Sequence, residues 1–542
     1  MPGEATPTPA EGGVPVTRYV LGVDLGTSGP KVALVTTTGE VVDHDTEKVG
    51  LTLLPKGGAE QDPDDWWAAI VASTRRLVDR NPAAAEQVTA ICMSSQWGGL
   101  VPVDAAGKHV HNALIWMDAR GVEYAEKLTG GGVTVPSTGY NARALREWIK
   151  LSGGVPSRSG KDPVGQAQFL RHDLPEVYAK TAYLLDVPEY LTMKVCGRAV
   201  AAYDTSTLRW ATDNRDPGAV RWDPGLVKRS GLDLAKLPEL VPPGSVVGTL
   251  LPEVAAELGL STDVQVVAGT GDTTSAAVGA GAVEDYAGHL YIGTSAWLTA
   301  HVPYKRTDVL HGVASLPAVV PNRYWIATVQ EVAGKAIEWL IDNVVYAQDG
   351  MLEDRPRPDD ALERLNALAA SAPAGANGVL FTPWLNGERT PIDDPFVRGG
   401  WHHVSLSTTR ADLARAVFEG IALNARWMKE TVERFTRKER PNGFSELTFV
   451  GGGARSALWC QTLADVLGCD IKQAKDPVLA NARGAALIAS VGAGEISWSD
   501  VSSRVEIDAV YRPNPAQTAL HDRQFRKFTA LYRRTKKLSK GE

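Results

Sequence analysis

Two features near the start of the chain combine a carboxylate with small turn residues, which suits phosphate and metal binding. In YVLGVDLGTSGPKVALV, residues 19–35, an apolar run carries Asp24 and then turns at Gly26, Thr27 and Ser28. Such a hairpin points backbone N–H groups and hydroxyls into one concavity, which can hold an anion. A hydrated divalent ion needs only one or two carboxylates. Asp24 is therefore a candidate for holding Mg²⁺ beside a phosphate.

The same pattern occurs again about half a chain length later. In GHLYIGTSAWLTAHV, residues 288–302, two apolar runs flank Gly293, Thr294 and Ser295. One such hairpin alone is most simply a β-turn. Two matched copies so far apart indicate two related halves rather than a short-period repeat. Facing each other, they can grip one polyphosphate from both sides, and Pro-Pro-Gly at 242–244 suits a linker between the halves.

A second carboxylate follows a glycine-rich turn in VQVVAGTGD, residues 264–272. Gly269 and Gly271 allow a substrate to approach the backbone closely. Asp272 is therefore a candidate general base for a substrate hydroxyl. An aspartate in a turn also often bonds its own backbone, so a purely structural role stays open.

Other phosphate-binding motifs fit poorly. No GxxxxGK[ST] loop is present. VAGTGDTTSA offers only GxG before an acidic residue that would repel a pyrophosphate, and FVGGGARSA lacks the last glycine of a dinucleotide fingerprint. These departures disfavour an NAD-dependent oxidoreductase.

The elements that must position these residues alternate between strands and helices, which predicts an α/β fold. We expect three strands within 19–50 and a helix over Asp64–Arg80. Strands are expected at 88–95, 113–120 and 264–272, and two more within 288–302. A long amphipathic helix is expected at 409–435, and further helices should begin near Ser456, cover 480–490 and end the chain near 515–536.

Composition excludes several classes. Of 542 residues, 44% are hydrophobic and 22% charged, and the net charge of −7 gives no field that recruits nucleic acid. The four cysteines form no CxxC pair, which fits a reducing cytosol and predicts a cytoplasmic protein. No run is apolar enough to span a membrane. Residues 1–17 and 537–542 are expected to be tails, the first of them disordered.

Several motifs in this order resemble the FGGY carbohydrate kinases, and EQDPDDWW and LGTSGPKV make the xylulokinase branch the nearest. Others that match are YIGTSAW, FTPWLNGERTP and VGGGARSALWCQTLADVLG. The resemblance covers about residues 19–536. It implies an actin-like ATPase (ribonuclease H-like) fold of two duplicated domains with a central cleft, divided into 18–246 and 247–536. It further implies ATP-dependent phosphorylation of a small sugar or polyol, and it is compatible with a homodimer that the residues themselves do not demonstrate.

The resemblance also implies roles for residues. Asp24 would hold Mg²⁺ and Asp272 would be the catalytic base. ATP would be bound by the two hairpins, a nearby basic residue and a third glycine loop: Gly26, Thr27, Ser28, Lys31, Gly293, Thr294, Ser295, Gly451, Gly452, Gly453 and Ala454. The sugar would contact Gln96, Trp97, Gly98, Asp118, Asp272 and Thr273.

Two departures from the family pattern fall where the sugar would bind. Relatives have Gln-Met-His-Gly where this chain has Gln96-Trp97-Gly98-Gly99, and Gly-Asp-Asn where it has Gly271-Asp272-Thr273. Trp97 can stack on a sugar or fill core. A site built on substrate hydrogen bonds discriminates strongly when a partner is lost. The resemblance makes a ketopentose such as xylulose the first expectation, while these departures leave ribulose, erythrulose, glycerol or gluconate, and a catalytically weak sugar sensor, open.

Two further motifs allow two interpretations each. Asp118 in IWMDAR lies in a stretch that the family places near the acceptor, or it forms an ion pair with Arg120. Glu388 and Arg389 in NGERTP order the cleft, or form a salt-bridged turn. His402-His403 is expected to be a polar turn rather than a metal site.

Overall fold

The computed structural model describes residues 17–136, 138–350 and 356–536. Apart from Thr17, the two expected tails lie outside the described residues. The first large sheet has the strand order β14(Val246–Thr249), β15(Gln265–Gly271), β6(Val88–Ser95), β1(Tyr19–Gly26), β2(Gly29–Thr36) and β3(Val41–Thr46). The three strands expected within 19–50 are confirmed, as are those at 88–95 and 264–272.

The second large sheet has the order β18(Thr307–Asp308), β19(Val313–Pro317), β20(Tyr324–Ala327), β17(Ala296–Val302), β16(Gly288–Ile292), β23(Glu446–Val450), β24(Asp470–Ala474) and β25(Ile507–Tyr511). In both sheets a hairpin (β1–β2, β16–β17) is followed by a strand parallel to its first arm (β6, β23). The next strands (β15, β24) are again parallel, and the edge strands (β14, β25) are antiparallel. The expected duplication is therefore confirmed in the strand directions.

The hydrogen-bonded sheets do not divide at the expected boundary between residues 246 and 247. β14 and β15 follow that boundary, yet β15 pairs in parallel with β6 and β14 pairs with β15. The first sheet therefore continues to Gly271, and Asp272 extends from the first half rather than the second. The Pro-Pro-Gly turn at 242–244 precedes an edge strand of the first sheet, and a turn signal alone does not show with which sheet the next strand pairs.

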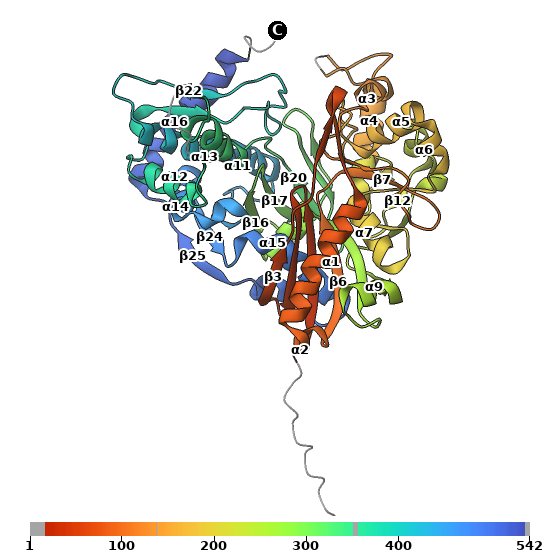
Figure 1. The fold of residues 1–542 in the computed structure, drawn as a ribbon. Coiled ribbons are helices and arrows are strands. Elements are labelled where there is room, and N and C mark those ends of the chain that lie inside the picture. Colours follow the sequence, from red (N-terminus) through yellow and green to blue (C-terminus); the bar gives the residue numbers. More distant parts are fainter. Residues whose placement is uncertain (1–16, 137, 351–355, 537–542) are drawn as a thin grey trace, which may run out of the picture.

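Helices cover both sheets, and smaller sheets extend them (Figure 1). The helices are α1(Pro63–Arg80), α2(Pro82–Ala85), α3(Val122–Thr129), α4(Ala142–Leu151), α5(Pro163–Asp173), α6(Pro175–Lys180), α7(Val187–Cys196), α8(Pro224–Arg229), α9(Pro252–Leu258), α10(Asp272–Gly279), α11(Gly334–Leu340), α12(Ala361–Ala370), α13(Arg410–Thr436), α14(Ala457–Leu467), α15(Ala480–Gly492) and α16(Pro515–Thr535). A five-stranded sheet contains β4(Thr52–Leu54), β5(Gly58–Gln61), β8(Ala113–Ile115), β7(Gly99–Val103) and β9(Tyr183–Leu185). Three two-stranded sheets pair β10(Val200–Ala202) with β13(Glu239–Val241), β11(Thr212–Asp213) with β12(Arg221–Trp222), and β21(Leu380–Thr382) with β22(Gly400–His402). The expected helices at 64–80, 409–435, 480–490 and 515–536 are confirmed within a few residues.

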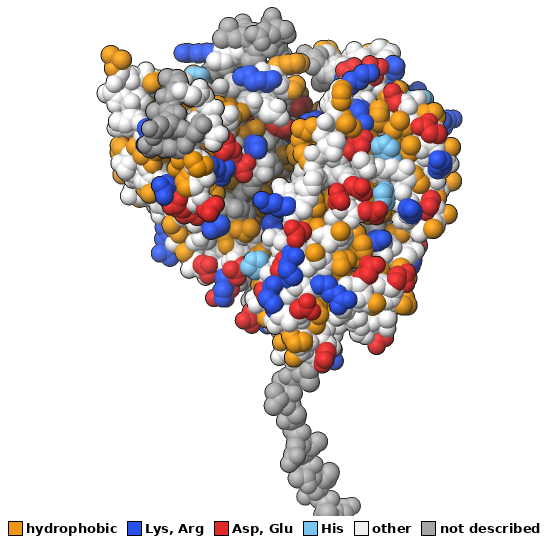
Figure 2. All heavy atoms as spheres, viewed as in Figure 1, with side chains coloured by type: hydrophobic (Ala, Val, Ile, Leu, Met, Phe, Trp, Pro, Cys, Tyr) orange, Lys and Arg blue, Asp and Glu red, His pale blue; other side chains and the backbone are white. Residues whose placement is uncertain are grey.

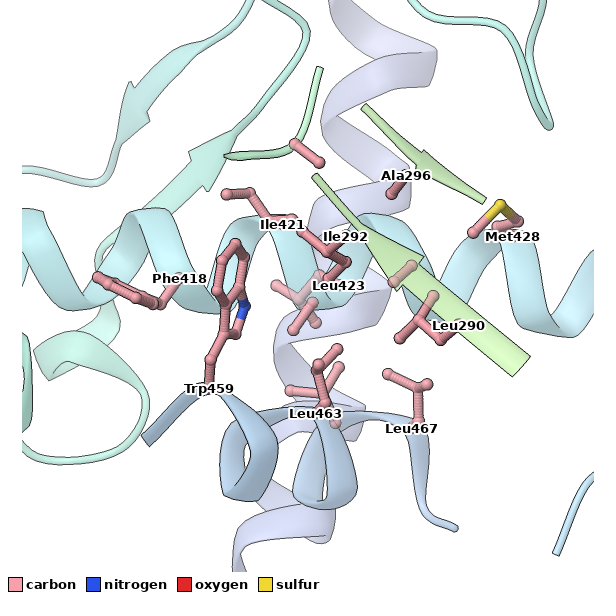
Figure 3. Packing of buried hydrophobic residues seen from close by; sticks show 14 of the residues in the cluster. Leu290, Ile292, Ala296, Phe418, Ile421, Leu423, Met428, Trp459, Leu463 and Leu467 are labelled. Carbon is pink, nitrogen blue, oxygen red and sulfur yellow. The ribbon is translucent and has the colours of Figure 1, made fainter. Parts of the chain in front are cut away.

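The core of the second half lies between its sheet and two long helices. Leu290 and Ile292 of β16 face Ile421 of α13 and Leu463 of α14, and all four are at most 1% exposed (Figure 3). Ser456 begins α14 as its N-cap, accepting a hydrogen bond from the Trp459 N–H at 3.0 Å, as the sequence predicted. This packing holds β16, and with it the second hairpin, in place.

Helices α10 and α15 cross in direct backbone contact, and α15 also lies against β1. A Cβ atom on Gly279 would overlap the carbonyl oxygen of Ala480, and one on Gly484 would overlap that of Ser275. A Cβ on Gly22 would overlap the carbonyl oxygen of Ala482. The small-residue helix of the second half is thus wedged onto the first sheet, and α15 lies at the centre of Figure 1.

The surface is hollowed between the two halves (Figure 2). Basic and acidic side chains are interspersed over the face shown there, without a large patch of one sign. Among the helices of the described residues, none has the length and apolar character needed to cross a membrane.

Adding a methyl group at the α10–α15 crossing should destabilise the protein. Alanine is favoured over glycine within a helix by about 1 kcal/mol. In Gly484→Ala the overlap with a backbone carbonyl outweighs this gain, because overpacking typically costs about 1–3 kcal/mol and the backbone cannot rotate away. We expect Gly484→Ala to melt several degrees below the parent in a thermal scan. Gly50→Ala, whose Cβ would meet open space, is the control, and equal melting temperatures for the two variants would contradict the interpretation.

Candidate active site

The two carboxylates singled out by the sequence lie at the same edge of the first sheet. Asp24 of β1 is aligned with Ser94 of the parallel strand β6, and Ser94 is aligned with Thr270 of β15. Asp272 follows β15 directly as the first residue of α10. Because the carboxyl ends of parallel strands meet at one edge, the fold brings both carboxylates to a common site.

Asp272 is half-buried and close enough to Asp24 to interact with its charge. Burial, and secondarily the carboxylate of Asp24, raise the pKa of Asp272 to about 7, against hydrogen bonds from Thr273 that oppose the shift. Those bonds come from the Thr273 N–H at 2.8 Å and its hydroxyl at 3.3 Å. A carboxylate with a pKa near neutrality is suited to accept a proton at physiological pH.

Asp24 is 3% exposed and is contacted from both halves of the protein. The Lys31 ammonium of the paired strand lies 3.6 Å from Oδ2, and the Asn481 amide of α15 lies 3.4 Å from Oδ1. These two long contacts leave most of the carboxylate's capacity unused. The carboxylates of Asp24 and Asp272 supply oxygen ligands that fit a hard divalent ion. The Lys31 ammonium lies nearby and is not a ligand.

The first hairpin turns through Thr27 and Ser28, since Gly26 pairs with Gly29. The Thr27 hydroxyl lies 3.1 Å from Oε1 of Gln96 and accepts from the Trp116 indole N–H at 3.0 Å. Its carbonyl accepts from Gln61 at 2.9 Å, and Gln61 in turn accepts from Gln96 at 3.0 Å. The Thr27 side chain therefore faces the neighbouring strand, while Ser28 at the hairpin tip is exposed.

The second hairpin and the third glycine loop follow neighbouring parallel strands, because Tyr291 of β16 is aligned with Val450 of β23. Thr294 at the tip of the hairpin is exposed, and its carbonyl accepts from the Ala333 N–H at 3.0 Å beside α11. In the loop, Gly452 is exposed with open space where a Cβ would be, whereas Gly451, Gly453 and Ala454 are buried. Only Gly452 of this loop offers an open backbone surface to a ligand.

Two of the residues expected to contact the sugar, Trp97 and Thr273, adjoin Gly271 and Asp272. Gln96 is 3% exposed and belongs to the Thr27 network, and Thr273 is 6% exposed. The Trp97 ring lies 3.0 Å from where a Cβ on Gly271 would be, and it packs edge-on against Trp325 of the second half at 5.3 Å between ring centroids. Trp97 thus contacts both halves, and it remains partly exposed.

Asp118 lies in a buried ion pair. The strand expected at 113–120 ends at Ile115, and the chain then turns so that Asp118 accepts from Arg120 at 2.6 Å and from the Ala59 N–H at 2.9 Å. Arg120 also pairs with Glu60 at 2.6 Å. Both carboxylate oxygens of Asp118 accept hydrogen bonds, and its ion pair with Arg120 is confirmed. A sugar contact by Asp118 stays a prediction.

Glu388 of NGERTP joins distant segments rather than forming an isolated turn. It is 2% exposed and accepts from the N–H of Glu331 at 2.8 Å and from Asn424 of α13 at 2.5 Å. Burial raises the pKa of Glu388 to about 7. Arg389 pairs with Glu331 at 2.6 Å, so the salt bridge is seen, and the ordering of a cleft by this motif stays a prediction.

Sequence reasoning missed three residues beside the carboxylates. Asn481 was seen only as part of a small-residue helix, although an amide among alanines marks a polar contact. Tyr291, stacked on Trp297 at 3.9 Å, was seen only as an apolar strand residue, although its ring lies against Gly293 of the second hairpin. Asp204 lies 66 residues before Thr270, to which it is hydrogen-bonded at 2.6 Å, and nothing local marks it.

Two duplicated sheets that meet beneath a pair of carboxylates and two hairpins define a two-domain kinase of the actin-like ATPase fold. Residues 19–279 match the N-terminal domain model of the FGGY family of carbohydrate kinases, and residues 289–493 match the C-terminal one. The chain belongs to this family and is a carbohydrate kinase.

Individual relatives agree with this assignment. A xylulose kinase from Staphylococcus epidermidis is 30% identical over 531 residues, covering 97% of this chain and 98% of the relative. A gluconokinase from Bacillus licheniformis is 24% identical and covers 95% of each chain. The crystal structure of a xyloylose kinase from Brucella ovis superposes with a TM-score of 0.82 at 24% identity, covering 96% of this chain and 100% of that one, and supports the fold.

Removing the charge of Asp272 should stabilise the metal-free protein at alkaline pH. The pKa of Asp272 in the folded state, about 7, exceeds the value of about 3.9 expected in the unfolded chain. The folded state therefore keeps this proton where the unfolded chain has lost it, and the resulting stability is complete below about pH 3.9 and lost as the pH rises through about 7. Asp272→Asn should raise the free energy of unfolding by up to about 4 kcal/mol at pH 8, and by less as the pH falls below 7.

Denaturation in EDTA at pH 8 and pH 5 measures this difference, and Asp213→Asn is a control of opposite sign. The hydrogen bond from Arg215 lowers the pKa of Asp213, so its charge stabilises the folded state at pH 8. Asp213→Asn should therefore destabilise the protein there. If Asp272→Asn is less stable than the parent at pH 8, the prediction is wrong. The charge of Asp272 is then stabilised by an interaction that the structure does not contain.

Proposed function

We propose that this protein transfers the γ-phosphoryl group of ATP to a hydroxyl of a ketopentose such as xylulose, with Asp272 as the base. The observation that carries the proposal is the pair of carboxylates, Asp24 and Asp272, at the carboxyl ends of β1 and β15 in a carbohydrate kinase fold. The 30% identity with a xylulose kinase over almost the whole chain supports this choice of acceptor. The solved glycerol kinase from Plasmodium falciparum, with ADP and a TM-score of 0.77 at 18% identity, has the same fold.

Phosphoryl transfer needs positioning and charge neutralisation more than covalent chemistry. Asp24, with Asp272 beside it, would hold Mg²⁺, which when bound neutralises charge on the phosphates. The hairpins at Gly26–Ser28 and Gly293–Ser295 would bind the phosphates through backbone N–H groups and hydroxyls, and the exposed Gly452 would lie against the adenosine. Lys31 would add positive charge beside Asp24.

Asp272 would orient the acceptor hydroxyl and take its proton as the new bond to phosphorus forms. Its raised pKa supports this role, because a carboxylate with a pKa near neutrality can both accept and release a proton. Trp97 lies beside Gly271, Thr273 donates to Asp272, and Gln96 precedes Trp97 in the chain, so these three would face the acceptor. Closure of the hollow over the sugar would exclude water, so we expect slow ATP hydrolysis without an acceptor.

A coupled ADP-release assay tests the substrate class. We expect ATP turnover with ketopentoses, and the highest kcat/KM with xylulose among xylulose, ribulose, erythrulose, glycerol and gluconate. A preference for gluconate or glycerol would keep the kinase and replace the acceptor. ATP binding without ADP release on any acceptor would favour a sugar sensor and overturn the proposal.

Substituting the base tests the site. Asp272→Asn keeps the shape and the acceptor for the Thr273 N–H, and should lower kcat by several orders of magnitude while ATP binding, measured by calorimetry, changes little. Asp213→Asn, which changes a buried aspartate of β11, should leave kcat within about threefold. Near-normal turnover by Asp272→Asn would remove Asp272 from the role of base.

A further inference from the structure

Asp204 is a buried carboxyl group that is hydrogen-bonded to both sides of the turn that carries Asp272. It lies between β10 and the 3₁₀ turn Thr205–Arg209 and is 2% exposed. Its Oδ2 atom accepts from the hydroxyls of Thr270 at 2.6 Å and Thr274 at 3.0 Å. These threonines stand two residues before and two after Asp272, so a single carboxylate oxygen ties both sides of the turn.

Further hydrogen bonds close the same turn. The hydroxyls of Thr270 and Thr274 lie 2.7 Å apart, and that of Thr274 also lies 2.9 Å from the Gly271 carbonyl oxygen, an alternative acceptor for its one proton. On the other side, the Ser275 hydroxyl lies 3.0 Å from the Asp272 carbonyl and 2.7 Å from the Ser94 hydroxyl of β6. The backbone of the turn is thus held from two directions.

The Asp272 carboxylate itself is held much less firmly. Within the described part of the chain, its hydrogen bonds come only from Thr273, the next residue. The direction of this side chain therefore depends on the backbone of the turn. Any displacement of Thr270 or Thr274 passes directly to Asp272.

Asp204 is well placed to fix the turn because its own position is anchored. The neighbouring Thr205 donates to Glu189 at 3.0 Å, and Glu189 forms a buried ion pair with Arg209 at 2.5 Å. Leu208 of the same 3₁₀ turn lies 3.0 Å from where a Cβ on Gly98 would be. The segment that is hydrogen-bonded to the turn of Asp272 therefore also contacts Gly98, one of the residues expected to contact the sugar.

We propose that Asp204 is a positioning residue for phosphoryl transfer, setting the placement of Asp272 against the acceptor hydroxyl through Thr270 and Thr274. The inference rests on the proposed function, because it takes Asp272 as the base. The rate depends strongly on the position of a catalytic group, since a misplacement of about 1 Å can cost about 100-fold in rate. Asp204 acts through the two threonines and does not touch the substrate.

The chemistry of the contact predicts which substitutions are tolerated. The threonines need an oxygen acceptor, and burial raises the pKa of Asp204, which favours an uncharged group there. An asparagine offers the same acceptor without a charge, whereas a leucine of similar size offers none. The Oδ1 atom of Asp204 is buried without a hydrogen-bond partner among the described residues, so replacing this oxygen by the amide nitrogen of asparagine breaks no hydrogen bond.

Steady-state kinetics with ATP and the best acceptor of the screen test the proposal. Asp204→Leu should lower kcat about 10- to 100-fold while KM for ATP and for the acceptor stays within about threefold. Asp204→Asn should restore kcat to within about threefold of the parent. Ser206→Ala, which removes a buried hydroxyl bonded to the Tyr203 carbonyl on the same 3₁₀ turn, should leave kcat unchanged. Equal kcat for Asp204→Leu and Ser206→Ala would overturn the proposal.

The threonines provide a second test that survives if Asp204→Leu fails to fold. Thr270→Val and Thr274→Val keep the shape of the side chains and lose the hydroxyls. Together they should lower kcat as Asp204→Leu does, because the carboxylate acts only through these two hydroxyls. A full kcat in the double valine variant would refute the positioning role.

A measurement without turnover separates this inference from the proposed function. Amide hydrogen exchange at residues 270–274 should be faster in Thr270→Val and Asp204→Leu than in the parent and in Ser206→Ala. If the parent shows no ADP release with any acceptor, the proposed function fails, while the exchange result still decides whether Asp204 orders the turn. Unchanged exchange in both variants would show that Asp204 does not hold it.

Discussion

The backbone contact between α10 and α15 is the constraint on which the site depends. Gly279 and Gly484 let the two helices touch without side chains between them, and Gly22 lets α15 lie against β1. Asp272 is the first residue of α10, and Asn481 is the second residue of α15. Because the helices meet backbone to backbone, no flexible side chain can absorb a shift, and the positions of both N-termini beside Asp24 are set by the fold.

The same contact joins the two halves directly beneath the site. A buried apolar cluster around it contains Val20 and Cys92 of the first sheet together with Val450 and Ile488 of the second half. The surface is hollowed between the same two halves (Figure 2). Any motion that closes the hollow must therefore pivot close to Asp24. The paired carboxylates would then stay together while the surfaces proposed for the phosphates and the acceptor approach each other, which suits a reaction controlled by positioning.

Features encoded locally could be predicted from the sequence, and features that depend on distant pairing could not. The two hairpins, Asp24 and Asp272 stand in short patterns of strand, glycine and hydroxyl residues, so these segments and the duplication were recognisable. The sheet to which β15 belongs could not be predicted, because β15 follows a linker-like turn and yet pairs with β6. Asp204 and Asn481 were missed because each contacts the site across a long sequence separation, and an isolated aspartate or asparagine carries no spacing signal.

The acceptor side shows why the substrate was the hardest feature to predict. The hydroxyl of Thr27 is shared between Gln96 and Trp116. The first hairpin and two segments expected near the sugar therefore belong to one hydrogen-bonded network. Trp97, which departs from the family pattern, touches Gly271 and packs on Trp325 of the other half. One side chain therefore lies against the turn before Asp272 and bridges the halves. Its identity cannot be explained by sugar recognition alone, because a change there alters the contact between the halves together with the surroundings of Gly271.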